Sequence, residues 1–422
     1  MSSSKKIILK STPYIIKKKG FSTIEFVFIY SCKYSKEYIP YLPLLRQLLL
    51  NTSKKYKTEK EYRQAYDEKF IISNRVNTFV FNDNLYFEFR LVVPDPKKVK
   101  DFDMNSAFEF FIDTIYNPNI IDEEFNKECF DREKRFLQSN VKNSKKNVYE
   151  KSYQSFLNIV DDIGVLKDNI YNNIDLLEKA NSKQLYNIYK DNILNNNPII
   201  FVSGDVDKDI NNFIKKYIKV NNEKIIIEKN YSNYLKPFDE LKEVDEVSSD
   251  HESVLYIAYK VKNMTEEDEL YLGIIKNILG HGSNDLIFKE LRMNKKLIYS
   301  SNTWMRKRAG LLVIESYINN TSKEKVVTSV KSVIKKLKDE EILLSYMEKL
   351  ISDLEFNLIR SKDSRVKDLN DFIDEKLGIG YSLETVLEMY KNDFDMKKLL
   401  NLLDRLTLDT IYFLRGEFNE EK

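Results

Sequence analysis

The sequence predicts a mixed helix-and-strand protein built from two similar domains. The order of elements (a strand, a helix, further strands and then paired helices) occurs in the first half of the 422-residue chain and again in the second half. The segment from Asn84 to Val93 alternates apolar and polar side chains with a period of two, which is typical of a strand. A repeat distance of about 200 residues indicates duplicated domains rather than a solenoid of short repeats.

The elements of the first half follow from composition and periodicity. β-Branched and aromatic residues are dense at 21–34, which predicts a strand there. Acidic residues followed by lysines suit the dipole of a helix at 122–141, and Ser182 suits the N-cap of a helix at 182–195. The other expected strands are 75–81, 84–93 and the start of 198–207, and the other expected helices are 40–51, 58–70, 103–116 and 148–160.

The second half repeats this order after a charged segment. The segment 221–250 is weakly periodic, which indicates a linker between a first domain at 1–220 and a second at 251–422. Strands are expected at 253–262, 297–304 and 309–317, and helices at 266–279, 323–339 and 341–360, with further helices to the C-terminus.

Composition excludes several classes of function. The 68 basic and 66 acidic residues leave a formal charge of +2, which argues against a nucleic-acid partner held by net charge. The two cysteines, Cys32 and Cys129, provide no disulfide framework, and Cys129 is expected to be a buried structural thiol. Lysines and Pro13 interrupt the apolar N-terminus, and no later stretch reaches about 18 apolar residues. We predict a soluble, cytoplasmic protein with no membrane partner.

The most specific pattern lies between Ser253 and about Lys338. After a strand and a helix, the turn Gly280-His281-Gly282 leads through Phe288 to Arg292 and Tyr299, which are seven residues apart. This pattern resembles the C-terminal domain of insulinase/pitrilysin-type (inverzincin) peptidases, in which such an Arg/Tyr pair faces the substrate near the scissile carbonyl. A guanidinium and a phenol can both donate hydrogen bonds to that carbonyl and to the oxyanion formed from it. Alternatively, Arg292 is a solvated helix charge and Tyr299 an ordinary strand aromatic.

Two signals in the first half support the resemblance. Gly204-Asp205 follows an apolar strand, as does the Gly-Asp turn near the end of the family's N-terminal domains. Asn77-Thr78-Phe79 is similar to the family's edge strand on which substrates are laid. Strand addition to such an edge supplies main-chain hydrogen bonds with little demand on sequence.

The chain departs from the family at the zinc motif. The family motif is His-x-x-Glu-His on a helix, shortly before a Gly-Thr pair. With Asn51-Thr52 in the Gly-Thr place, Leu42, Leu45 and Arg46 occupy the motif positions. Leucine has no lone pair to offer a metal, and a cationic arginine repels Zn²⁺. We therefore predict that this chain holds no zinc.

The third zinc ligand of the family is a glutamate on a later helix. An alignment through Glu133-Lys134 puts Asn140 at that position. The chain has two histidines, His251 and His281, and neither begins a His-x-x-Glu-His motif. His281 is interpreted as a turn or surface residue. No metal or other cofactor is expected in this chain.

The resemblance implies an α+β protein with two homologous domains, each a mostly antiparallel sheet with helices packed on one face. Two such domains form half of a four-domain clamshell, which family members of this length complete by dimerising. In heterodimeric members one subunit carries the zinc motif and the other keeps the Arg/Tyr pair. This chain resembles the second kind. The resemblance thus implies a non-catalytic subunit, inactive alone, whose Arg292 and Tyr299 complete the active site of a zinc-bearing partner that cleaves peptides, such as leader segments of modified ribosomal peptides.

A second hypothesis from another class stays open. The chain can be a scaffold or peptide-binding module with no role in cleavage, like the core subunits of respiratory complexes that share this fold. A third reading, an independently active metalloprotease, requires stoichiometric zinc in the purified chain, which we do not expect.

Overall fold

The structure is a computed structural model that divides into two compact units. The first unit comprises 1–141, 169–230 and 359–382, and the second comprises 142–168, 231–358 and 383–422. The residues that the structure describes are 5–81, 83–144, 146–161, 164, 166–219, 224–229, 234–280, 285–362 and 364–417.

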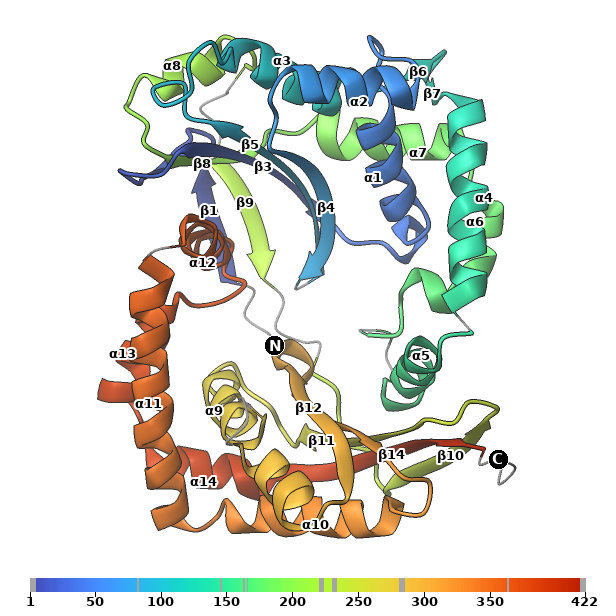
Figure 1. The fold of residues 1–422 in the computed structure, drawn as a ribbon, viewed down its shortest axis with the longest axis vertical. Coiled ribbons are helices and arrows are strands. Elements are labelled where there is room, and N and C mark those ends of the chain that lie inside the picture. Colours follow the sequence, from blue (N-terminus) through green and yellow to red (C-terminus); the bar gives the residue numbers. More distant parts are fainter. Residues whose placement is uncertain are drawn as a thin grey trace. The chain divides into compact units, whose positions relative to one another are not determined.

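The first unit is built on a five-stranded sheet. Its strands, in chain order, are β2 (Tyr14–Lys17), β3 (Thr23–Lys33), β4 (Ser73–Phe81), β5 (Asn84–Pro94) and β8 (Ile199–Gly204). Their order in the sheet is β2-β8-β3-β5-β4, and every neighbouring pair is antiparallel except β2 with β8. β4 therefore forms one edge of the sheet (Figure 1).

The second unit repeats this topology strand for strand. Its strands are β10 (Lys242–Ser248), β11 (Ser253–Val261), β12 (Ile298–Arg306), β13 (Leu311–Ile318) and β14 (Leu406–Gly416). The sheet order is β10-β14-β11-β13-β12, again with a single parallel pair, β10 with β14. In each sheet, the strand that comes last in the sequence (β8 or β14) lies between the two strands that come first. This shared order confirms the predicted α+β fold of two similar halves.

The last strand of each sheet ends in a glycine for a steric reason. A Cβ on Gly204 would lie 3.1 Å from the Thr23 carbonyl oxygen, and its φ of +152° is in the region that favours glycine. A Cβ on Gly416 would lie 2.6 Å from the Asp250 carbonyl oxygen. The Gly-Asp signal at 204–205 thus marks a close approach to the start of the second strand, and Gly416 repeats it.

Helices cover one face of the first sheet. Alternate side chains of β3, among them Phe26, Phe28 and Tyr30, pack against this layer, whereas Val27 and Ile29 face the opposite side. The helices of the layer are α1 (Tyr41–Asn51), α2 (Glu59–Glu68), α3 (Met104–Tyr116), α4 (Lys127–Ser144), α6 (Ile174–Lys179), α7 (Ser182–Tyr189) and α8 (Ile210–Lys215).

The opposite face of this sheet carries a thinner layer. The two-stranded sheet of β1 (Lys5–Lys10) and β9 (Lys224–Lys229) lies there with one helix, α12 (Arg365–Leu377). Leu369, Ile373 and Leu377 of α12 pack in the same cluster as Val27 and Ile29. A helix from the second half of the chain thus completes the first unit.

The second sheet is arranged in the same way. Its main helix layer consists of α9 (Asp268–Gly280), α10 (Lys323–Lys336), α11 (Glu340–Lys362), α13 (Leu383–Asn392) and α14 (Met396–Arg405). On the other face lies α5 (Val148–Val160), a helix from the first half of the chain. The Phe156 ring of α5 stacks on Tyr256 of β11, with centroids 4.7 Å apart.

Several local predictions need correction. The chain was expected to end in helices, but its last element is the strand β14, between β10 and β11. Strands β9 and β10 lie within the segment expected to be a linker. The acidic residues at 122–124 precede α4 in a hairpin of β6 (Ile120–Ile121) and β7 (Glu124–Phe125), with positive φ at Asp122 and Glu123. Asn181, rather than Ser182, caps α7.

Other expectations agree with the structure. Cys129 is buried. Within the described ranges, none of the helices is both long and apolar enough to cross a bilayer. The remaining elements are short turns of 3-10 or π-helix at Lys36–Tyr38, Ile170–Asn172, Lys190–Leu194, Phe288–Asn294 and Lys307–Ala309.

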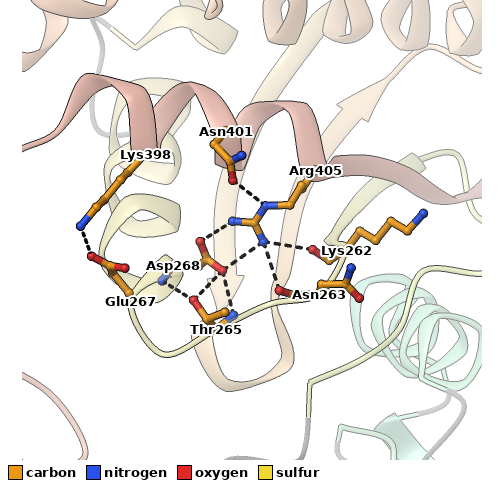
Figure 2. A network of polar contacts seen from close by, with 8 residues as sticks. All are labelled: Lys262, Asn263, Thr265, Glu267, Asp268, Lys398, Asn401 and Arg405. Carbon is orange, nitrogen blue, oxygen red and sulfur yellow. Dashed lines mark hydrogen bonds and ion pairs between the residues drawn. The ribbon is translucent and has the colours of Figure 1, made fainter.

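A polar network joins the start of α9 to the end of α14 (Figure 2). Arg405 donates hydrogen bonds to both carboxylate oxygens of Asp268, at 2.5 and 3.1 Å, and to the carbonyls of Lys262 and Asn263 at 3.1 Å. Thr265 donates to the same carboxylate. Burial alone would raise the pKa of Asp268, but these hydrogen bonds hold it below its ordinary value.

Replacing Arg405 by alanine should lower the free energy of unfolding of the second unit by about 2 kcal/mol at pH 7. The pKa of Asp268 is lower in the folded state than in the unfolded state, where it is about 3.9. The stabilisation from its ionised carboxylate is therefore complete above the unfolded pKa and is lost as the pH falls through the folded pKa. The loss caused by Arg405→Ala should therefore be equal at pH 7 and 5 and smaller at pH 3. Urea unfolding followed by the fluorescence of Trp304, the single tryptophan, measures it. A loss that is independent of pH down to 3 would contradict the assignment.

Candidate functional site

The helix with the altered zinc motif, α1, is fixed by its apolar side chains. Leu45 is 1% exposed and packs into the core of the first unit, Leu42 is half-buried against the same core, and Arg46 is exposed. The first two positions therefore serve packing, and the third presents a cation to solvent. None of the three side chains supplies a donor that suits Zn²⁺. Among the residues that the structure describes, no group of three or more His, Cys, Asp or Glu could hold a metal ion.

The predicted third-ligand position, Asn140, is exposed on α4. The contact between α1 and α4 that the structure shows is made by other residues. Asn51 Nδ2 at the end of α1 lies 3.5 Å from Glu133 Oε1, and Arg132 holds the same oxygen at 2.9 Å. Glu133 is buried, and sequence reasoning used it only as an alignment anchor. The assignment of Asn140 stays a prediction.

The residues expected to form a substrate edge, Asn77, Thr78 and Phe79, lie on β4 at the edge of the first sheet. Asn77 Nδ2 donates to Glu88 Oε1 at 3.0 Å, and the Phe79 ring stacks on Tyr86 with centroids 4.9 Å apart. These contacts fix two side chains of the strand from one face. The contacts hold β4 against β5, so that the other side of β4 is the edge to which a strand could be added. Use of this edge by a substrate stays a prediction.

Arg292 binds the first residue of β12, the edge strand of the second sheet, and Tyr299 is the second residue of that strand. Arg292 lies in the π-helical segment Phe288–Asn294, and its Nη1 donates to the carbonyl oxygen of Ile298 at 2.9 Å. The Tyr299 side chain is 59% exposed, and its hydroxyl donates to Asn319 Oδ1. The register between β12 and β13 shifts between Ile298 and Ser300, so Tyr299 sits at a bulge. Bulges commonly re-aim a side chain next to functional sites.

Tyr299 also lines a cavity of about 860 Å³ inside the second unit. Tyr317 lies at the end of β13 and Asn319 directly after it. His251 and Glu252 precede β11, and α5 supplies Tyr149. The volume falls in the range of ligand pockets in proteins. Sequence reasoning missed Tyr149, Glu252 and Tyr317, because no motif contains them and the fold alone gathers them. His281, interpreted above as a turn residue, lies outside the described residues.

Comparison with known proteins finds a similar family model and a similar curated protein. Residues 179–352 match the family model described as "Peptidase M16 inactive domain". A curated protein of Bacillus subtilis (strain 168), "Probable inactive metalloprotease YmfF", is 22% identical over 419 residues, which cover 96% of each chain. The chain is therefore similar to peptidases of the M16, or insulinase, type. The predicted resemblance to insulinase-type peptidases, in a form described as inactive, is thereby confirmed.

Solved structures share the fold over the whole chain. A conserved protein from Enterococcus faecalis V583 superposes with a TM-score of 0.79 at 16% identity, covering 100% of both chains. The periplasmic protease PqqL from Escherichia coli superposes with a TM-score of 0.63 at 10% identity, covering 99% of this chain but 46% of that one. The chain described here thus corresponds in fold to about half of the longer protein.

Proposed function

We propose that this chain is the non-catalytic subunit of a heterodimeric zinc peptidase and that it supplies Arg292 and Tyr299 to the active site of its partner. The observation that carries the proposal is the placement of these two side chains. Both are exposed, both are anchored at the start of one edge strand, and Tyr299 opens into a cavity of about 860 Å³. A solvated helix charge and an ordinary strand aromatic would not require this arrangement.

The anchoring leaves both side chains able to bind a peptide carbonyl. A guanidinium carries five N–H donors in a fixed plane, and the bond from Arg292 to Ile298 uses one of them. The Tyr299 hydroxyl donates to Asn319 in the structure, so a substrate carbonyl would compete with the amide oxygen of Asn319 for that proton. If both groups donate to the same substrate oxygen, they would stabilise negative charge that develops on it.

The need for a partner follows from the chemistry of α1. The side chains of Leu42, Leu45 and Arg46 do not fit a zinc ion, so this chain contributes no metal to the reaction. The partner would be an M16 subunit of similar length with an intact His-x-x-Glu-His motif. The match of this whole chain to 46% of PqqL supports the idea that a second half is required. We propose unfolded peptides as substrates, leader segments of modified ribosomal peptides among them, in the cytoplasm.

Reconstitution tests the proposal. The purified chain, a zinc-loaded M16 partner and their equimolar mixture are each incubated with a quenched-fluorescence peptide. We expect cleavage by the mixture at least tenfold faster than the sum of the separate rates, and zinc by elemental analysis in the partner alone. Formation of a stable complex with no gain in cleavage would favour a scaffold role. Stoichiometric zinc in this chain would contradict the proposal.

A further inference from the structure

The cavity beside Tyr299 has aromatic walls. The rings of Tyr149 and Tyr317 meet edge to face, with centroids 5.2 Å apart and planes at 71°. Tyr299 lines the same cavity from β12. Burial and the adjacent Glu315 carboxylate raise the pKa of Tyr317, so its phenol stays neutral at physiological pH. The faces of neutral tyrosine rings carry negative potential and attract cations.

The charge that lines the cavity is also negative. Glu252 lies in the lining, where its carboxylate accepts a hydrogen bond from the Tyr149 hydroxyl. Among the described residues that form this lining, none is a lysine or an arginine, and His251 is the one other ionisable group besides the tyrosines. A bound anion would therefore face a carboxylate, and no lysine or arginine of this lining would offset it.

A second cavity, of about 440 Å³, is also lined by tyrosines and carboxylates. It shares Tyr149 with the larger cavity and is lined by Glu150 and Glu315. Glu315 accepts hydrogen bonds from Trp304 Nε1 at 3.2 Å and from the Tyr317 hydroxyl at 2.6 Å. These neutral donors orient the carboxylate without cancelling its charge. Carboxylates and aromatic rings thus line both cavities, although Tyr153 of the smaller one accepts a hydrogen bond from Arg306.

We infer that the larger cavity binds the cationic side chain of a lysine or arginine in the peptide substrate. The inference rests on the proposed function and adds a specificity to it. Asn319 and Ser300 at the same lining offer polar groups to the backbone of such a peptide, which favours a peptide over a free polyamine. Glu252 would bind the cationic group, and Tyr149 and Tyr317 would cover its aliphatic stem. A peptide with a glutamate at that position would be disfavoured.

Direct binding to the isolated chain tests this inference without the partner. Three fluorescein-labelled pentapeptides are compared by fluorescence polarisation; they have alanine at four positions and arginine, citrulline or glutamate at the third. Citrulline keeps the shape of arginine and removes its charge. We expect the arginine peptide to bind about tenfold more tightly than the citrulline peptide, with the glutamate peptide weakest. Spermidine should compete less well than the unlabelled arginine peptide.

Variants separate the cavity from general surface charge. Glu252→Gln should reduce the preference for arginine over citrulline to roughly threefold or less. Tyr149→Leu should weaken the arginine peptide more than the citrulline peptide, because leucine still covers the aliphatic stem but its side chain does not attract a cation. Glu324→Gln, which removes an exposed carboxylate on α10, serves as the matched control and should change nothing. Equal affinities for the three peptides, or a preference that survives Glu252→Gln, would overturn the inference. Failure of the reconstituted cleavage alone would overturn the proposed function and leave this result standing.

Discussion

Replacing Tyr299 by phenylalanine should lower kcat of the reconstituted peptidase by roughly 100-fold and leave KM nearly unchanged. The substitution removes one hydroxyl and keeps the ring that lines the cavity. If the phenol stabilises charge that develops on the scissile carbonyl, its loss is felt in the transition state and not in the bound ground state. Loss of a single oxyanion donor costs about 100- to 1,000-fold in enzymes where it has been measured.

Arg292→Ala should reduce kcat by a similar factor, and the double variant should cost less than the product of the two because both donors serve one oxygen. The matched control is Tyr381→Phe, which removes the hydroxyl of another exposed tyrosine. Steady-state kinetics at several peptide concentrations separate kcat from KM. A rise in KM with kcat unchanged would assign Tyr299 to substrate binding alone. Wild-type kinetics in both variants would exclude the pair from the active site.

The sequence predicted the elements with strong local patterns. The expected helix at 148–160 coincides with α5, and the strand expected at 21–34 contains β3, Thr23–Lys33. β14 was missed because it follows the amphipathic helix α14 directly, and Leu406 to Arg415 was not separated from the helical run before it. The positions of α5 and α12 were also beyond local reasoning. Each packs on a sheet made by the other half of the chain, and no local periodicity specifies a partner so distant in sequence.

In the candidate site, too, the sequence could predict some residues and not others. Arg292, Tyr299 and the altered motif at Leu42, Leu45 and Arg46 could be found because they occupy fixed positions in a known pattern. Tyr149 and Glu252 could not, since 103 residues separate them and they meet only because α5 packs beside β11. The sequence thus predicted the groups that would act on the peptide bond. The groups that would select the substrate depend on tertiary structure.

A buried ion pair at the centre of the second sheet should dominate the stability of that unit. Lys260 Nζ of β11 lies 3.1 Å from Asp409 Oδ2 of β14, and both side chains are 0% exposed. Lys260 also donates to the carbonyl of Lys236 at 3.2 Å and lies 3.8 Å above the ring of Phe238. The backbone N–H of Phe238 donates to Asp409 Oδ1 at 2.7 Å. The pair therefore attaches the segment before β10 to two central strands.

Asp409→Asn should lower the free energy of unfolding of the second unit by about 3–5 kcal/mol, because it leaves the Lys260 ammonium buried without its counter-ion. Urea unfolding followed by Trp304 fluorescence gives the value for this unit. Asp404→Asn is the matched control. It removes one charge from an exposed pair with Lys338 in the turn after α10 and should cost at most about 1 kcal/mol. Adding Lys260→Met to Asp409→Asn should recover part of the loss, since no unpaired charge then remains. Equal effects of the two Asn substitutions would show that the buried pair is not a main determinant of stability, and that the fixed position of the 236–238 segment has another cause.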